Sequence, residues 1–184
     1  MLMLTDPGSP EGLHIITPPT LIPAKPVENW QDIIPEALDI LQGIRNKGFI
    51  FPNSDYTDCF AIAQPQVSPN PLQYFVLNDG DNFDRVTKQF GGLVVINPVL
   101  IGKLRASRVW FKDACMSYPY SKPVKLKRYH EVRVSYDTIK HVEGGFLTSP
   151  KLEQVREKQL TGEAALVFLH ELEHLRGQSI YAQA

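Results

Sequence analysis

The sequence has few cysteines, no long apolar run and no excess of charge of one sign. Only Cys59 and Cys115 occur in 184 residues, which argues against a secreted disulfide scaffold and favours a reducing cytoplasm. The apolar stretches are too short or too interrupted to span a bilayer. With 19 basic and 20 acidic side chains, the formal net charge is −1, so no overall positive field would attract nucleic acid. We therefore expect a cytoplasmic protein with no membrane contact and no direct specific nucleic-acid binding.

Lys and Arg are also absent from the first 24 residues, although a signal or transit peptide would normally be positively charged there. We expect no targeting segment. Residues 1–20 are rich in Pro and Gly without a helical or alternating period, which predicts an irregular N-terminal arm. The hydrophobic content of 43% is enough to fill one core of this size. The sequence thus predicts a single catalytic domain over residues 21–184, and it carries no indication of oligomeric state.

Apolar periodicity predicts an α+β fold. A 3.6-residue period begins near Asn29 and ends near Gly43 or Gly48, as expected for one amphipathic helix. Short β-prone runs bounded by turn formers follow it. These runs cover residues 60–63, 74–77, 93–96, 108–111 and 126–136. In the last run charged and apolar residues alternate from Glu131 to Tyr136, which predicts a strand with one face in the core. Together these runs predict a mixed, mainly antiparallel sheet.

The last part of the chain contains a second predicted helix. Residues 137–160 form a connection to which the pattern assigns no structure. Thr161 is a candidate N-cap for the helix, an apolar run follows it, and Gly177 is placed to end the helix.

The segment HELEH, from His170 to His174, carries the clearest chemistry. One helical turn separates the two histidines, so both imidazoles can reach a single metal ion. Glu171 would then lie beside the first ligand, where a carboxylate can accept a proton from metal-activated water. The competing reading is a pair of surface histidines on an ordinary helix.

A catalytic metal of this kind needs a third protein ligand, and Cys115 in the segment DACMS is the candidate outside the helix. Packing as a small buried side chain is the alternative for this cysteine. The HExxH pattern also marks zinc endopeptidases, which usually take a third His or Glu beyond the helix. Only ten residues follow His174, so Cys115 favours a different hydrolase.

Three ordered segments resemble the motifs of the peptide deformylase family. They are CFAIAQPQ at 59–66, DACMS at 113–117 and HELEHLRG at 170–177. AKPV at 24–27 and INPV at 96–99 also resemble segments of that family, and the likeness runs from about residue 21 to the end. The resemblance implies a peptide deformylase-like fold with mixed, mainly antiparallel sheets around a C-terminal metal-binding helix. It also implies a short form without the further C-terminal helix of longer bacterial members.

The resemblance implies roles for particular side chains. The implied ligands of one divalent metal ion are Cys115, His170 and His174. The metal would be Fe(II) in vivo, with Zn, Ni or Co as substitutes, and this ligand set suits all of them. Glu171 would be the general acid and base. The side-chain amide of Gln66 and the backbone N–H of Met116 would stabilise the oxyanion.

The family removes the N-formyl group from the initiator methionine of nascent peptides and releases formate. The implied partners are therefore N-formylated nascent peptides, with the ribosome as a further candidate. The implied pocket for the methionine side chain is formed by Phe60, Ala61, Phe111, Leu166 and Val167. Core packing is the competing explanation for these residues. Phe60 and Phe111 are bulkier than the aliphatic residues expected there, which predicts a smaller or reshaped pocket.

Several positions depart from the family pattern. Cys59 and Ala61 replace glycines of the first motif, and we consider that Cys59 could form a disulfide with Cys115 in metal-free protein. Asp113 has a shorter side chain than the family's glutamate, so it could fail to reach Arg128, its positional partner, with a loss of metal affinity. A deformylase-like binding protein with weak or altered activity is therefore the non-enzymatic alternative.

Basic residues gather in the predicted strand region after the second motif. Lys122, Lys125, Lys127 and Arg128 form this cluster. From the sequence alone we interpret it as the solvated face of a strand rather than as a polyanion site.

Overall fold

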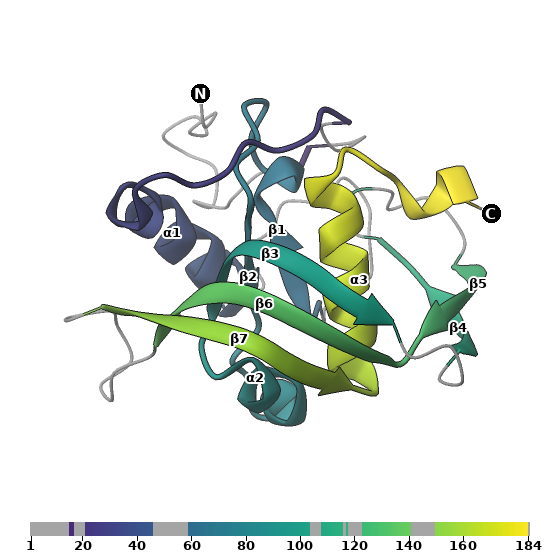
Figure 1. Cartoon of the computed structure of the whole chain (residues 1–184). Coiled ribbons are helices and arrows are strands. Elements are labelled where there is room, and N and C mark those ends of the chain that lie inside the picture. The colour runs from purple at the N-terminus through teal and green to yellow at the C-terminus, as the bar shows by residue number, and fades with distance from the viewer. Residues whose placement is uncertain are drawn as a thin grey trace.

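The computed structural model describes residues 15–16, 21–45, 59–103, 108–115, 117, 123–140 and 150–183. One antiparallel sheet lies at the centre, α3 crosses it, and a separate two-stranded ribbon stands beside α3 (Figure 1). The order in the sheet is β1-β2-β3-β6-β7, and the ribbon is β4-β5. This is the α+β fold with mainly antiparallel sheets around a C-terminal helix that the sequence predicts.

The strands have the following bounds. They are β1 Ala61–Ala63, β2 Tyr74–Leu77, β3 Val94–Lys103, β4 Arg108–Asp113, β5 Val124–Tyr129, β6 Glu131–Lys140 and β7 Lys151–Thr161. The helices are α1 Ile34–Arg45, α2 Asp84–Phe90 and α3 Glu163–Leu175, and a 3-10 helix, Trp30–Ile33, leads into α1. No helix among the described residues is long and apolar enough to cross a membrane.

Both faces of the central sheet are covered by apolar side chains. In β2, Tyr74 and Val76 belong to the cluster that contains α1. Phe75 and Leu77 belong to the cluster that contains α3 and α2. Because neighbouring strand residues point to opposite faces, α1 and α3 pack on opposite sides of the sheet. Burial on both faces explains why β2 is a continuous apolar run instead of an alternating one.

The run predicted as a single strand over 126–136 is in fact two strands in different sheets. The chain leaves β5 at Tyr129, turns at His130 and enters β6 at Glu131. The alternation of charged and apolar residues is interrupted at this turn, from Arg128 to Glu131, and the prediction of a single strand overlooked that interruption. Within β6 the predicted half-burial is confirmed, since Val132 and Val134 are fully buried whereas Arg133 is exposed.

The connection left unassigned over 137–160 contains regular structure. Its first residues complete β6, and β7 begins at Lys151. As an edge strand β7 exposes most of its side chains, so it lacks the alternation that would have identified it. The seven-residue helix α2 was also not predicted.

The ends of α3 differ in how well the sequence predicted them. Thr161 is not the N-cap: it is the last residue of β7, and Gly162 takes the cap position with φ 58°. Gly177 ends the helix as predicted, with φ 68°. Its N–H donates to the carbonyl of His174 at 3.0 Å, and the N–H of Gln178 donates to Glu173 at 2.9 Å. These two bonds form the Schellman arrangement that glycine favours.

Candidate metal centre

Helix α3 brings two histidines toward the cysteine that follows β4. Cys115 is 3% exposed and lies two residues beyond the end of that strand. Its Sγ is 3.2 Å from Nε2 of His174, and this nitrogen is 3.3 Å from Nε2 of His170. All three ligand atoms lie within 4.8 Å of one another. The structure thus brings together the three residues predicted as metal ligands.

The donor set fits a four-coordinate metal ion. Metal–nitrogen distances of about 2.0–2.1 Å and a metal–sulfur distance of about 2.3 Å give tetrahedral edges of about 3.3 Å between nitrogens and about 3.6 Å between nitrogen and sulfur. The observed separations are 3.3 Å and 3.2 Å. The nitrogen pair therefore already fits, and the thiol needs to move only slightly. With three protein ligands, a fourth position stays open for chemistry.

A buried charge network orients the first histidine. Oδ1 of Asp113 lies 2.9 Å from Nδ1 of His170, which leaves Nε2 of that ring facing the other donors. Arg128 donates from Nε to Oδ2 of the same carboxylate at 3.1 Å, and its Nη2 forms an ion pair with that oxygen at 2.9 Å. Its two terminal nitrogens also form a fork on the carboxylate of Glu173, at 2.6 Å and 2.7 Å. Such contacts fix the tautomer and direction of a ligating imidazole.

The expectation that Asp113 could fall short of Arg128 is therefore wrong. The shorter side chain reaches both the guanidinium and the imidazole, because β4 and β5 are paired and place the two residues on the same face of the ribbon. Burial alone would raise the pKa of Asp113, but its hydrogen bond with His170 and the charge of Arg128 hold that pKa below its usual value. Asp113 is thus an ionised partner within the network.

Protonation differs between the two histidines. Burial acts to lower the pKa of His170, but the hydrogen bond with Asp113 outweighs burial and raises it well above its usual value. Burial and the neighbouring His170 lower the pKa of His174. A metal ion would therefore displace a proton from the first ring and find the second already neutral.

The amide of Gln66 is held beside the thiol. Its Oε1 accepts the N–H of Ala63 at 2.8 Å, and its Nε2 donates to Oγ of Ser117 at 3.1 Å. The same Nε2 is 3.8 Å from Sγ of Cys115. These contacts assign the amide orientation, because the oxygen already has a donor and the nitrogen must then face the site. Ser117, fully buried, was quoted in the second motif but received no role from the sequence.

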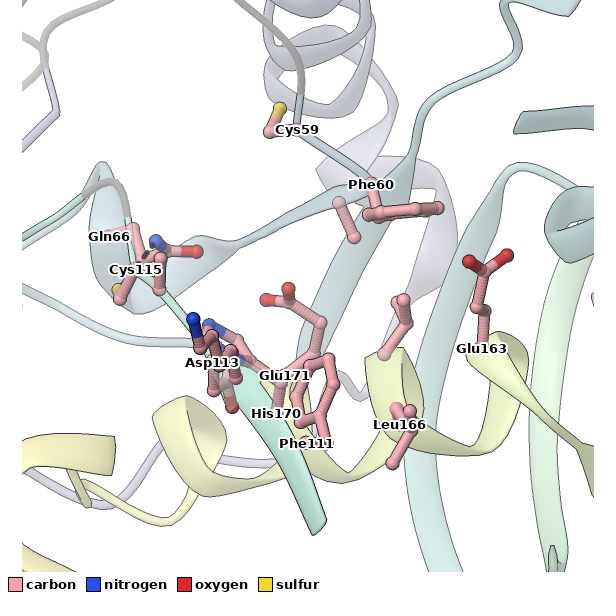
Figure 2. A pocket seen from close by; sticks show the side chains of 14 residues that line it. Cys59, Phe60, Gln66, Phe111, Asp113, Cys115, Glu163, Leu166, His170 and Glu171 are labelled. Atoms are coloured by element: carbon pink, nitrogen blue, oxygen red, sulfur yellow. Dashed lines mark hydrogen bonds and ion pairs between the residues drawn. The ribbon is translucent and has the colours of Figure 1, made fainter. Parts of the chain in front are cut away.

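Glu171 is the buried carboxylate of the site. It is 4% exposed, and its Oε2 has no hydrogen-bond partner among the described residues. Burial raises the pKa of Glu171 to about 7. Figure 2 shows this carboxylate projecting into the pocket between Phe111 and Phe60. A carboxyl group with a pKa near neutrality can both accept and release a proton at physiological pH.

A pocket of about 270 Å³ joins these groups. Small-molecule sites typically measure about 300–1,000 Å³, so this one suits a single side chain and a small reacting group. Its wall contains all the residues predicted to bind substrate. They are Phe60, Ala61, Phe111, Leu166 and Val167. Gln66, Asp113, Cys115, His170 and Glu171 also line it. Met116 lies outside the described residues.

Glu163 is a pocket residue that the sequence analysis missed. It is the first residue of α3, one turn before Leu166, and its side chain is 43% exposed. Its carboxylate pairs with Arg85 at 2.8 Å. The helical spacing from Leu166 could have indicated its position, since residues three apart share a helix face. An acidic group therefore borders a pocket predicted to be apolar.

The disulfide considered between Cys59 and Cys115 after metal removal and oxidation stays a prediction. Both cysteines line the pocket, and no bond joins them. In Figure 2 the Cys59 side chain points away from the metal ligands.

Comparison with known proteins identifies a family and similar solved structures. The family model described as polypeptide deformylase matches residues 23–184. Among solved structures, peptide deformylase from Thermotoga maritima is 22% identical, with a TM-score of 0.67 over 94% of this chain and 97% of that one. The Ehrlichia chaffeensis enzyme in complex with actinonin is 20% identical, with a TM-score of 0.67 over 94% and 88% of the two chains.

A probable peptide deformylase from Synechococcus phage S-SSM7 is 19% identical, with a TM-score of 0.62 over 93% of this chain and 99% of that chain. The comparison with curated proteins gave no match. At these identities the solved structures establish the shared fold, and the family model covers nearly the whole sequence. From the matched residues 23–184 and the fold that carries them, we conclude that the chain belongs to the polypeptide deformylase family.

Proposed function

We propose that this protein hydrolyses the N-formyl group of N-formylmethionyl peptides, releasing formate and a free amino terminus. The observation that carries the proposal is Glu171: an unpartnered, buried carboxylate oxygen in the same pocket as three metal-ligand atoms. Nascent peptides in the cytoplasm are the proposed substrates.

The residues of the pocket support a division of labour. The Glu171 carboxylate would accept a proton as water adds to the formyl carbon. It would then give that proton to the amine nitrogen as the carbon–nitrogen bond breaks. Nε2 of Gln66 would donate a hydrogen bond to the formyl oxygen as negative charge develops there. The contacts with Ala63 and Ser117 hold this donor before substrate arrives.

The metal site would be occupied by one divalent ion held by Cys115, His170 and His174, and we propose Fe(II) as the resident metal. When bound, this ion would act as a Lewis acid toward the formyl carbonyl and make water a better nucleophile. A thiolate with two imidazoles is also compatible with zinc, nickel or cobalt. Asp113 and Arg128 would keep the ligands oriented.

The test is formate release from formyl-Met-Ala-Ser by anaerobically prepared, Fe(II)- or Co(II)-loaded protein. We expect turnover by the wild type and a fall in kcat of about 10²- to 10⁴-fold in Glu171→Gln, the range typical of a general base. Glu157→Gln, which makes the same chemical change at an exposed position of β7, should behave as the wild type.

Three outcomes would contradict the proposal. Equal rates in wild type and Glu171→Gln would remove the assigned base. Cleavage of internal peptide bonds without formate release would favour an endopeptidase. Tight binding of the formylated peptide to metal-loaded protein without turnover would instead identify a deformylase-like binding protein.

A further inference from the structure

The outer face of the β4-β5 ribbon concentrates positive charge. Strand pairing sets Arg108 opposite Tyr129, Trp110 opposite Lys127 and Lys112 opposite Lys125. Directly opposed residues share a face, so these six side chains form one surface, which we call the ribbon face. Its members are Arg108, Trp110, Lys112, Lys125, Lys127 and Tyr129. The four basic residues are all exposed.

The ribbon face contains no acidic residue to balance this charge. Between residues 103 and 127 the sequence has a single acid, Asp113, and it points to the opposite face, where Arg128 and His170 neutralise it. Glu173 lines the adjoining cleft of about 510 Å³, where it pairs with the inward-facing Arg128 instead of with a cation of the ribbon face. The positive charge is therefore local, in a chain whose formal net charge is −1.

The arrangement goes beyond the ordinary polar face predicted from the sequence. Lys112 and Lys125 are directly opposite one another, and like charges in such a pair destabilise an antiparallel sheet. Arg128, which the sequence analysis placed in the basic cluster, is only 5% exposed and faces inward. Arg108 and Lys112 come instead from the facing strand. The tertiary structure thus assembles a different and more concentrated set of cations.

Two aromatic rings are interleaved with these cations. Trp110 is 62% exposed, an unusual level for so large an apolar side chain. The ammonium groups of Lys125 and Lys127 lie 5.3 Å and 5.9 Å from the centre of its ring. The guanidinium carbon of Arg108 lies 5.2 Å from the ring centre of Tyr129. Contacts of this kind hold the long basic side chains over the ribbon face.

We propose that the ribbon face binds single-stranded RNA, with its lysines and arginine on phosphates and Trp110 against a base. Alternating cations and exposed aromatic rings are the combination that single-stranded nucleic acid requires, because phosphates need charge and unpaired bases need a flat apolar partner. An acidic peptide or an anionic lipid surface would satisfy the charge but would give the Trp110 ring no stacking partner. Six-residue strands extend for about 20 Å, long enough for several nucleotides. Binding would be independent of base sequence.

Most of the ribbon face lies on the other side of β4 from the metal ligands, and the two surfaces adjoin at Lys112, which also lines the pocket. Phe111 and Asp113 project from the inner face of β4 toward the pocket, whereas Trp110 projects from the outer face. The inference therefore does not rest on the proposed hydrolysis, and either can fail alone.

The test is fluorescence titration of the full chain with a 12-nucleotide oligouridylate and a 12-nucleotide oligoadenylate. The chain has two tryptophans, so Trp30→Phe leaves Trp110 as the single reporter. We expect RNA to quench Trp110, with binding that weakens as salt is raised. Lys125→Gln/Lys127→Gln should make the slope of log K against log salt shallower by about 1.4, since each phosphate contact on a single strand contributes about 0.7.

A matched control removes two lysines elsewhere. Lys88 pairs with Asp84 and Lys140 pairs with Glu153, so Lys88→Gln/Lys140→Gln makes the same change in net charge outside the ribbon face. This variant should retain the wild-type salt slope. Trp110→Ala removes the reporter, so its RNA binding is followed by the anisotropy of a fluorescein-labelled 12-nucleotide oligouridylate. It should be weaker by about 5- to 150-fold, the loss expected for one stacked base. Circular dichroism melting of each variant checks that the fold is intact.

Three outcomes would overturn the proposal. One is the absence of Trp110 quenching and of salt-dependent RNA binding. Another is an equal decrease in the slope of log K against log salt in both double-lysine variants. The third is binding of polyglutamate, or of vesicles containing phosphatidylserine, as tightly as RNA at the same salt concentration.

Discussion

Replacing Asp113 with Asn tests whether the buried network holds the metal centre in shape. The carboxylate accepts a hydrogen bond from Nε of Arg128, forms an ion pair with Nη2 of the same residue and contacts Nδ1 of His170. An asparagine of nearly the same size keeps one acceptor oxygen and presents an NH₂ group in place of the other. The NH₂ group of the asparagine would then face an N–H group of Arg128 or of His170. Since Asp113 is only 4% exposed, water could not take the place of the lost acceptor.

The expected magnitude follows from what the substitution leaves behind. Losing one partner of a buried ion pair costs about 3–5 kcal/mol when the remaining charge is uncompensated. Here Glu173 still pairs with Arg128, so the cost should approach that of charge-assisted hydrogen bonds, about 1.5–3 kcal/mol. Metal affinity should fall by about 10- to 100-fold, because His170 loses the contact that fixes its ring.

Two measurements on the same samples check this. Urea unfolding of metal-free protein gives the loss in free energy of unfolding, and competition with a chromophoric chelator for Zn(II) gives the affinity. Asp137→Asn is the matched control, since Asp137 also pairs with an arginine, Arg156, but at 23% and 53% side-chain exposure. Such a pair is worth about 0–1 kcal/mol. If Asp113→Asn costs no more than Asp137→Asn and metal affinity is unchanged, the network does not have the role assigned to it.

Two further predictions concern the core and the pocket. Burial raises the pKa of Tyr136 in the folded protein far above its usual value. The neutral hydroxyl therefore stabilises the fold fully below pH 10, about the pKa of tyrosine in the unfolded chain, and this stabilisation declines as the pH rises further. Between pH 8 and pH 11 the free energy of unfolding, measured with urea, should fall by about 1.4 kcal/mol less in Tyr136→Phe than in the wild type. Parallel plots of this free energy against pH for the two proteins would contradict the prediction. Glu163→Leu removes the acid at the pocket wall. The kcat/KM for formyl-Met-Ala-Ser divided by that for formyl-Lys-Ala-Ser should then rise about fivefold, because the substrate lysine loses an exposed ion pair of about 1 kcal/mol with Glu163. An unchanged ratio would show that Glu163 does not face the substrate.

The sequence by itself determined the candidate metal ligands and the general architecture. His170 and His174 are four residues apart on a helix, so local geometry fixes their common direction without knowledge of the rest of the fold. Cys115 and Gln66 were found through motif resemblance. The sequence also predicted the amphipathic α1, the apolar β2 and the end of α3 at Gly177, because each depends on contacts or backbone angles within a short segment.

Long-range pairing decided what the sequence left open. The turn at His130 separates β5 from β6, because each strand finds its partner elsewhere in the chain. Pairing also sets Asp113 and Arg128 on the inner face of the ribbon and the opposed lysines on the outer one. The sequence shows which residues alternate, but only the register across two strands decides which of them meet. For that reason the metal site could be predicted from the sequence, whereas its charge network and the basic ribbon face became visible only in the tertiary structure.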